Sequence, residues 1–440
     1  MNIKTHILTS TLLLTLSSVT FAEDWPQWMG ERRDGVWREQ GVIDSIPASG
    51  LPVKWRVPVA LGYSGPAAAD GKVFVMDYEV AGGEPKNDPG SAVKLNGNER
   101  LLCIDAETGK EIWKHSYSQP YSISYPGGPR CTPTVDGDHV YMLGAEGHLT
   151  CLKTNNGEVV WEKSLPETYN TKTAIWGYSS HPLIDGDLLY TIAGGKGSVA
   201  VALNKHTGEE VWRALSAGDP GYNSPTMIEH AGVKQLLIWT PASLNSLEPK
   251  TGKVYWSLPL KPGFNMSIMG PRKSGSYLYV SAIGNVSALI KLDDDKPGAK
   301  FVWKGTPKKS IFCANTTPFI DGDMLYGCDV ETGALIGASL KDGKRLWQTT
   351  KATDKSPRRS RHATAFLVKH EDRYFLFNEL GDLILAKLSP DGYEEEGRFH
   401  VLEPTNEAFG RDVVWSHPAF ANRSLFARND KELVCVDLAK

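Results

Sequence analysis

The stretch DAETGKEIW at Asp105–Trp113 joins a tight turn to a strand that carries a tryptophan, and related stretches recur along the chain. They read TNNGEVVW at Thr154–Trp161, NKHTGEEVW at Asn204–Trp212, EPKTGKVYW at Glu248–Trp256 and LKDGKRLW at Leu340–Trp347. Self-similarity with a period of roughly 40–50 residues is typical of propellers and solenoids. The repeat therefore predicts the fold class while leaving the function open.

A second repeated feature precedes the first. A proline stands upstream of most of these tryptophans, and Asp-Gly turns follow several of the prolines, at Asp70-Gly71, Asp136-Gly137, Asp185-Gly186 and Asp321-Gly322. Asp-Gly between apolar runs is a strong hairpin signal because glycine supplies the positive φ that such turns need. With the two strands around the turn before each tryptophan, every repeat predicts the four antiparallel strands of a propeller blade.

Counting the repeats predicts eight blades. A seventh blade, from His362 to about His400, has Phe399 in place of the tryptophan, and an eighth begins at Pro418 but ends after three strands. VKWRVP at Val53–Pro58 supplies the missing fourth strand, and this closure removes free sheet edges. We therefore predict an all-β, eight-bladed β-propeller whose last blade is closed by the N-terminal strand. The tryptophans expected to dock between blades are Trp55, Trp113, Trp161, Trp212, Trp256, Trp303 and Trp347.

These Thr-Gly-x-x-x-Trp repeats resemble those of the pyrroloquinoline-quinone-like (PQQ-like) β-propeller family, which includes quinoprotein alcohol dehydrogenases and the outer-membrane assembly factor BamB. The resemblance covers about residues 53–440. The opening DWPQW at Asp24–Trp28 resembles the start of a BamB-like, secreted bacterial branch of this family. The motif is specific for the fold rather than for a function, because the tryptophan is a packing device.

Composition and the N-terminal segment predict an exported protein. The chain has 440 residues, a net charge of −3 and no dominant basic run, so nucleic acid is not an expected partner. Residues 1–22 are predicted to be a signal peptide, with Lys4, an apolar stretch and small residues up to Ala22. The apolar stretch is too short for a membrane span. No cysteine follows the expected cleavage point, so we expect a periplasmic or secreted monomer without a lipid anchor.

The predicted organisation of the chain is a signal peptide over 1–22, an N-terminal arm over 23–52 and the propeller over 53–440. The arm contains Trp25, Trp28 and Trp37. Three large aromatic side chains are expected to pack on the propeller rather than remain in solvent.

The predicted functional site lies at one mouth of the central channel, because the loops that enter the inner strands share one face. These loops place polar and aromatic residues around the mouth, and concave sites with a few convergent polar groups are the default binding candidates. The alternative is that the residues only fill and solvate the mouth. The candidates for ligand or partner binding are Tyr63, Arg130, Trp176, Tyr178, His181, Tyr222, Asn223, Asn315, Arg361, His362, Trp415 and His417.

Two further segments are expected on the same face. Val80–Arg100 is rich in Gly, Pro and Asn, and it is either a mobile loop or lid or a tolerated surface insertion. Lys351–His362 contains five basic residues. With Arg130 these could bind an anionic ligand or an acidic partner strip, or they could form a solvated charge run.

The six cysteines predict no attached c-type haem, because no C-x-x-C-H motif is present. Cys131 is expected at a strand entrance and partly exposed. Cys313 and Cys328 are expected to lie nearly opposite each other, where a disulfide could form in an oxidising compartment. The remaining three share one repeat position and are expected to be small buried hydrophobic residues: Cys103, Cys151 and Cys435.

Three function classes remain open, and we favour an exported, non-enzymatic propeller that acts as a protein-interaction scaffold or ligand-binding module in the cell envelope. The resembling PQQ-dependent dehydrogenases need adjacent cysteines, Glu and Asn ligands for calcium, and an Asp base. Here no two cysteines are adjacent and no funnel position is acidic, so no catalytic residue, metal ligand or PQQ site is assigned. The third class is a glycan- or small-anion-binding module that stacks its ligand on Tyr63, Tyr178, Tyr222, Trp176 and Trp415.

Overall fold

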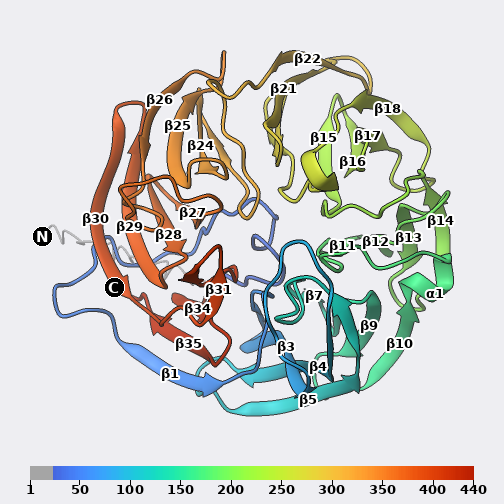
Figure 1. Ribbon diagram of the computed structural model, residues 1–440, viewed down its shortest axis with the longest axis horizontal. Helices are drawn as coiled ribbons and strands as arrows, with labels where there is room; N and C mark the ends of the chain where they lie inside the picture. The colour runs from blue at the N-terminus through green and yellow to red at the C-terminus, as the bar shows by residue number, and fades with distance from the viewer. Residues whose placement is uncertain (1–22) are drawn as a thin grey trace, which may run out of the picture.

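A computed structural model describes residues 23–440 and confirms the predicted eight-bladed β-propeller, with its sheets arranged around a central axis (Figure 1). The predicted signal peptide, 1–22, lies outside the described residues. Helix is confined to α1 (Leu165–Tyr169) and the 3-10 turn η1 (Gly263–Asn265) in the described part of the chain. Within residues 23–440, no helix has the length and apolar character of a membrane span.

The first four blades follow the chain from the inner strand outward, in antiparallel order. Blade 1 also pairs its third strand with a short additional strand, β6 (Tyr121–Ile123). The strands are β2 (Ala67–Ala69), β3 (Lys72–Gly82), β4 (Val93–Asp105) and β5 (Glu111–Ser118); β7 (Thr134–Asp136), β8 (His139–Leu143), β9 (His148–Lys153) and β10 (Val159–Ser164); β11 (Leu183–Asp185), β12 (Leu188–Ile192), β13 (Ala200–Asn204) and β14 (Glu210–Ala214); and β15 (Thr226–His230), β16 (Val233–Trp239), β17 (Ser243–Leu247) and β18 (Val254–Pro259).

The last four blades repeat the pattern, and the hairpin of β31 (Asn406–Ala408) and β32 (Arg411–Val413) is inserted before blade 8. The strands are β19 (Arg272–Ser274), β20 (Tyr277–Ala282), β21 (Val286–Leu292) and β22 (Ala299–Lys304); β23 (Phe319–Asp321), β24 (Met324–Asp329), β25 (Ala334–Ser339) and β26 (Arg345–Thr349); β27 (Ala365–His370), β28 (Arg373–Asn378), β29 (Asp382–Ser389) and β30 (Gly392–His400); and β33 (Ala419–Ala421), β34 (Ser424–Arg428), β35 (Glu432–Asp437) and β1 (Val53–Pro58).

The ring closes as the sequence predicts. β1 pairs antiparallel with β35 and completes blade 8, so that Trp55 lies opposite Cys435. This pairing joins the two ends of the propeller sequence in one sheet, which Figure 1 shows at the lower left. The buried apolar cluster around it combines residues of blades 1, 7 and 8 with the arm.

The repeated tryptophans join neighbouring blades. Trp113 of blade 1 donates its indole N–H to the Thr154 carbonyl of blade 2, with a nitrogen–oxygen distance of 3.0 Å. Gly157, in the turn that follows, has a φ of +71°, and a Cβ there would lie 2.5 Å from the Trp113 ring. The glycine of the motif is therefore needed twice, for its backbone conformation and for the close approach of the ring. Indole N–H groups also reach a carbonyl of the next blade from Trp55, Trp161, Trp212, Trp303 and Trp347.

Trp256 departs from this pattern. Its indole donates to the Gln235 side chain of its own blade, at 2.9 Å, rather than to the next blade. The corresponding turn of blade 5 runs through Asp293–Gly298 and lacks the Thr-Gly sequence. The acceptor is therefore supplied from within blade 4.

The N-terminal arm touches the blades in their order along the chain, starting with blades 1 to 4. Trp25 forms a β-bridge to Ala68 of blade 1, and the Pro26 carbonyl accepts a hydrogen bond of 2.8 Å from the Val135 N–H of blade 2. The Arg33 guanidinium donates to the carbonyls that precede the inner strands of blades 3 and 4, which belong to Pro182 and Pro225.

The arm then continues across blades 5 to 8. The Asp34 carbonyl accepts a hydrogen bond from Arg272 of blade 5, and Gly35 lies against Phe319 of blade 6. The Trp37 N–H donates to the Lys369 carbonyl of blade 7, at 2.8 Å. Finally the Glu39 carboxylate accepts a hydrogen bond from the Arg423 N–H of blade 8. The arm thus follows one end of the channel around the whole ring. All three of its tryptophans, Trp25, Trp28 and Trp37, are buried.

Three local expectations need correction. Most of the insertion Val80–Arg100 is not a mobile loop, because β3 and β4 extend into it and leave only 83–92 between them. Cys131 is fully buried rather than partly exposed. Cys313 lies outside β23 and is not opposed to Cys328 in the β23–β24 ladder. Both are buried free thiols, as are the other cysteines, and burial raises the pKa of Cys328 to about 12.

Candidate functional site

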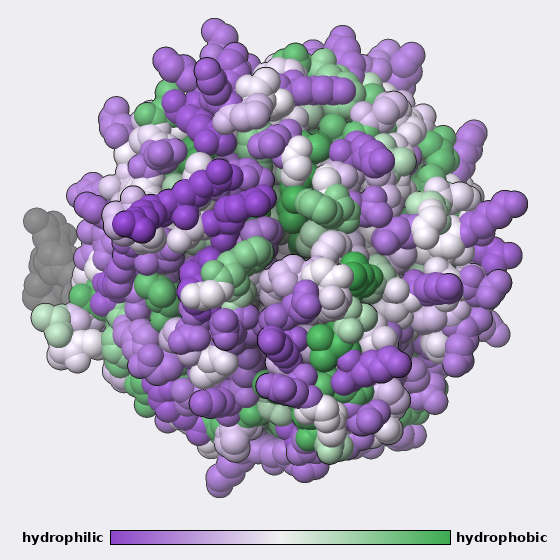
Figure 2. Space-filling model, viewed as in Figure 1, coloured by the Kyte–Doolittle hydropathy of each residue, from purple (hydrophilic) through white to green (hydrophobic). Residues whose placement is uncertain are grey.

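The mouth of the channel opposite the arm holds a cavity of about 410 Å³. Its wall is built from the loops that enter the inner strands and from three further segments. These are the insertion that contains Pro89, the loop that contains Phe264 and the β31–β32 hairpin that contains Phe409. Figure 2 shows this face, with apolar side chains around a central hollow and strongly hydrophilic side chains beside it. The size lies within the range of small-ligand pockets, roughly 300–1,000 Å³.

The cavity brings together most of the residues that the sequence analysis placed in the funnel. Ten line it: Tyr63, Arg130, Trp176, His181, Tyr222, Asn315, Arg361, His362, Trp415 and His417. Two do not reach it. The Tyr178 hydroxyl is buried and donates to the Ala193 carbonyl, and the Asn223 amide donates to the Met269 carbonyl, so both hold the loops behind the wall.

Several lining residues were missed by the sequence analysis, because they come from loops outside the repeat. They are Pro89, Tyr125, Phe264, Met266, Ile283 and Phe409; Ser179 and Ile268, which also line the cavity, stand at the repeat position three residues before an inner-strand proline. Phe264 and Phe409 are the most exposed phenylalanines of the described residues, at 74% and 49%. A phenylalanine beside Gly or Asn in a short polar loop was the signal that could have indicated them.

The rim contains an aromatic cluster. The His362 ring stacks on Phe409 with a centroid distance of 4.6 Å and an interplanar angle of 7°, and Trp415 lies 6.2 Å from Phe409. His362 and Phe409 have φ angles of +64° and +53°, and Tyr125 and Phe264 have +50° and +53°. Bulky residues rarely occupy this left-handed region, and such conformations concentrate at functional sites.

The insertion fixes the β31–β32 hairpin that carries Phe409. The Asn87 side chain donates to the Asn406 side chain at 2.6 Å and to the Glu407 carbonyl at 2.7 Å. The Tyr63 hydroxyl donates to Asn87 at 3.3 Å. Figure 1 shows β31 close to the channel axis. The insertion therefore supports the rim and positions Phe409 over the cavity.

Arg130 and Arg361 differ in which groups already bind their guanidinium N–H groups, and so in what remains to contact a ligand. The Arg130 guanidinium donates to the backbone carbonyls of Ser124, Tyr125, Gly128 and Trp176. No carboxylate of residues 23–440 lies within ion-pair distance of it, and its hydrogen bonds all go to backbone carbonyls. It lies 5.3 Å from the centroid of the Tyr63 ring, a cation–π geometry.

Arg361 is more exposed and shares one carboxylate with its neighbour. Glu331 forms ion pairs with Arg359 at 2.5 Å and with Arg361 at 3.3 Å. Behind them, Glu379 pairs with Arg411 at 2.7 Å and accepts a hydrogen bond from Trp415. Burial raises the pKa of Glu379.

The floor of the cavity separates it from the arm. The Trp28 ring stacks on His181 with a centroid distance of 4.6 Å and an angle of 5°, and it meets His417 edge-on at 6.2 Å. The His181 Nδ1 accepts a hydrogen bond from the Thr132 N–H at 2.9 Å. Because His181 and His417 also line the cavity, the arm closes the channel beneath them.

The histidines of the cavity favour the neutral state. Burial lowers the pKa of His417 to about 4, and burial together with Arg361 lowers the pKa of His362 to about 4. The pKa of His181 is also well below its ordinary value, because of burial and then of the charge of Arg33. Imidazolium charge therefore does not contribute to the cavity near neutral pH.

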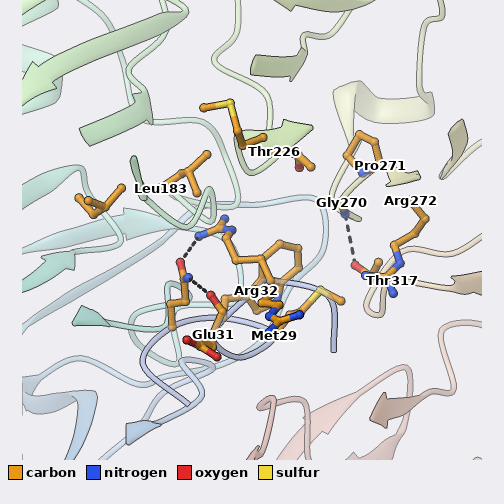
Figure 3. Close-up of a pocket in the computed structure, with 14 residues that line it drawn as sticks. Met29, Glu31, Arg32, Leu183, Thr226, Gly270, Pro271, Arg272 and Thr317 are labelled. Carbon is orange, nitrogen blue, oxygen red and sulfur yellow. Dashed lines mark hydrogen bonds between the residues drawn. The ribbon is translucent and has the colours of Figure 1, made fainter. Parts of the chain in front are cut away.

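A smaller hollow of about 180 Å³ lies at the other end of the channel, between the arm and blades 3 to 6 (Figure 3). Its polar groups largely bind one another. Gln27 accepts from Arg33 and donates to the Glu31 carbonyl, and the Gly270 N–H donates to the Thr317 hydroxyl at 3.2 Å. We interpret this hollow as packing space beside the arm.

The sequence of the chain matches a known protein family along the whole propeller. The family model described as "Outer membrane protein assembly factor BamB" matches residues 47–224, 97–261 and 240–440, which together span the propeller. The chain belongs to the BamB family. BamB of Shewanella oneidensis is 22% identical over 347 residues, which cover 73% of this chain and 86% of that protein.

The solved structures agree with the fold of this BamB-family propeller. The crystal structure of BamB from Moraxella catarrhalis has a TM-score of 0.56 and 13% identity, and the match covers 88% of this chain and 97% of that one. A polyvinylalcohol dehydrogenase from a Pseudomonas species is 24% identical over 252 residues, which cover 54% of this chain and 35% of that enzyme. The family thus has relatives named as assembly factors and as dehydrogenases.

The cavity of this BamB-family member does not fit the site that the quinoprotein resemblance implies for PQQ and calcium. Its lining residues, all in the described part of the chain, include no carboxylate that could bind calcium or act as the base. Two carboxylates contact lining residues from outside the cavity: Glu379 is bound by Arg411 and Trp415, and Glu331 pairs with Arg359 and Arg361. The buried cysteines do not line the cavity. No quinone-dependent step can be assigned to these residues.

Proposed function

We propose that the chain is an exported, monomeric, non-enzymatic propeller of the cell envelope that binds a protein partner on its funnel face. The observation that carries the proposal is the exposure of Phe264 and Phe409, held in left-handed conformations above an apolar cavity. Exposed aromatic side chains around a concave site are typical of interaction surfaces. The name of the Shewanella relative, an outer membrane protein assembly factor, is consistent with such a role.

The test is site-specific photo-cross-linking in cells of the source bacterium. A photoreactive residue at position 409 is expected to give a discrete protein adduct in the envelope fraction. The control carries it at Val211, which is 50% exposed on an outer strand of blade 3. Equal labelling at both positions, or no adduct at 409, would contradict the proposal. Alcohol oxidation by the purified protein with PQQ and calcium would establish the dehydrogenase instead.

A second candidate is a small-ligand or glycan-binding module, and one observation favours it. The Tyr222 hydroxyl is buried in the cavity wall without a hydrogen-bond partner. A buried hydroxyl in this state would gain a bond from a ligand. Trp176 and Trp415 would supply stacking surfaces. Retention on a polysaccharide column that is lost in Trp415→Ala would support this candidate, and no retention on any glycan tested would remove it.

A further inference from the structure

We propose that the partner presents a segment in which an apolar anchor side chain enters the funnel and acidic residues beside it face blade 7. The inference rests on the proposed function and specifies the chemistry of the partner. Two sets of side chains carry it: the aromatic rim, and the arginines along one edge of the rim.

The aromatic rim requires an apolar anchor. Phe264 and Phe409 stand on loops of blades 5 and 8, on different sides of the cavity, and both expose a large part of their rings. Beside Phe264 the wall is formed by Met266 and Ile268 of the same loop and by Ile283 of blade 5. An apolar side chain placed here would remove both rings and the wall from water, which is the main source of binding energy at such surfaces.

The backbone of the rim is built at a cost to stability. Phe264, His362 and Phe409 all have φ between +50° and +65°. Such residues each cost on the order of 1–3 kcal/mol and persist where the surrounding structure holds them. Stacking of His362 on Phe409 and the Asn87 bonds to the hairpin provide that support. The rings are therefore fixed before a partner arrives, which lowers the entropy lost on binding.

The edge along blade 7 requires acidic residues. Arg358, Arg359 and Arg361 lie together on the loop before β27, and among residues 23–440 only Glu331 forms an ion pair with any of them. Arg358 is exposed and forms no ion pair within the described residues. Figure 2 shows a row of strongly hydrophilic side chains beside the hollow. The excess of positive charge favours a carboxylate through charge-assisted hydrogen bonds.

The charge on the hairpin edge of the rim determines the direction in which the partner segment would lie. Glu407 and Asp412 are exposed on the β31–β32 hairpin and lie opposite each other in the register of its two strands. Their negative charge disfavours an acidic residue on the hairpin side. The acidic residues of the partner are therefore expected over blade 7, and the anchor between Phe264 and Phe409.

The test uses the protein purified from cells and three immobilised peptides, measured by biolayer interferometry. One carries a phenylalanine beside two aspartates, one a phenylalanine beside two lysines, and one an alanine beside two aspartates. We expect the acidic phenylalanine peptide to bind on the order of tenfold or more tightly than either of the others, a difference of about 1.4 kcal/mol. Binding should weaken as salt is raised.

Variants separate the two sets of side chains. Phe264→Ala with Phe409→Ala is expected to lose the preference for phenylalanine over alanine. Arg358→Glu is expected to lose the preference for aspartate over lysine and to keep the phenylalanine preference. The matched control is Lys308→Glu, an exposed lysine between blades 5 and 6 that is outside the cavity and in no ion pair within residues 23–440.

The outcomes distinguish the inference from the proposed function. Equal binding of the three peptides, or an Arg358→Glu effect no larger than that of Lys308→Glu, would overturn the inference even if an adduct forms at position 409. Competition by a free aromatic acid as strong as that by the peptide would also overturn it, because the site would then accept a small molecule. Loss of the 409 adduct would instead reject the proposed function itself.

Discussion

The two ends of the central channel are formed by the same eight inner strands, yet they differ in the burial of their aromatic side chains. At the arm end, Trp25, Trp28 and Trp37 are buried, and Arg33 gives its N–H groups to backbone carbonyls. At the funnel end, Phe264 and Phe409 remain exposed. The arm end buries its large aromatic side chains, whereas the funnel end leaves apolar surface available.

The difference also appears in the backbone. At the arm end, hydrogen bonds join the arm to successive blades, and its left-handed residues Met29 and Arg33 lie in turns that are hydrogen-bonded within the arm. At the funnel end, left-handed phenylalanines occur on loops that carry the candidate binding surface. The contacts of the arm and the candidate binding surface thus occupy opposite faces of one ring, and this arrangement allows each to be changed separately.

The largest expected effect is at the arm end. Trp37→Ala removes a fully buried indole that packs against Phe375 and Phe420, and truncation of this kind costs about 3–5 kcal/mol. Urea unfolding followed by circular dichroism would measure the loss. Phe409→Ala is the control at the other end, and we expect it to change the free energy of unfolding by much less. Equal losses in the two variants would remove the distinction between the ends.

A pH effect of intermediate size is expected at the floor that separates the two ends. Burial lowers the folded-state pKa of His417 to about 4, below the ordinary histidine pKa of about 6.5. Unfolding therefore takes up a proton as the pH falls below about 6.5, and stability decreases towards pH 4, by up to about 1.4 kcal/mol per pH unit for each proton. His181 and His362 act in the same direction. His417→Phe should reduce this slope in urea titrations at several pH values, whereas Val211→Ala, which changes an exposed non-titrating side chain on an outer strand, should not. An unchanged slope in His417→Phe would show that this group does not titrate with folding.

The smallest expected effect is an increase in the free energy of unfolding, whereas the two preceding predictions are decreases. Phe264→Gly relieves a left-handed conformation that costs roughly 1–2 kcal/mol, against a loss of roughly 0.5–1 kcal/mol from the added freedom of the unfolded chain. We expect a net stabilisation of about 0.5 kcal/mol together with weaker peptide binding. Phe264→Ala, which keeps the Cβ, should weaken binding without this gain. Destabilisation by Phe264→Gly would indicate that the ring supports the loop rather than a partner.

Much of the fold could be predicted from the sequence because one physical contact recurs. The Thr-Gly turn and the tryptophan are two sides of the same inter-blade contact, as Gly157 and Trp113 show, so their spacing reports the blades directly. The same reasoning could not find the changed partner of Trp256, because Gln235 lies on a strand that carries no part of the motif.

The candidate site was predictable only where it follows the repeat. Positions before the inner-strand prolines, such as Tyr63 and Trp415, do line the cavity. Phe264 and Phe409 come from irregular loops, whose direction depends on tertiary contacts such as those of Asn87. The sequence also shows an arginine at position 130 without showing that carbonyl oxygens already occupy most of its N–H groups.

The path of the arm has a consequence for the order of folding. Trp25 and Trp28 are among the first residues of the described chain to be synthesised, but the arm also binds Arg423 of the final blade and pairs with Ala439, which follows that blade. Its complete seat does not exist until nearly the whole chain has been made. The segment that is made first is therefore expected to be placed last, and its docking would be a late kinetic step that follows assembly of the ring. A chain that stops before blade 8 would leave the arm without its final attachment.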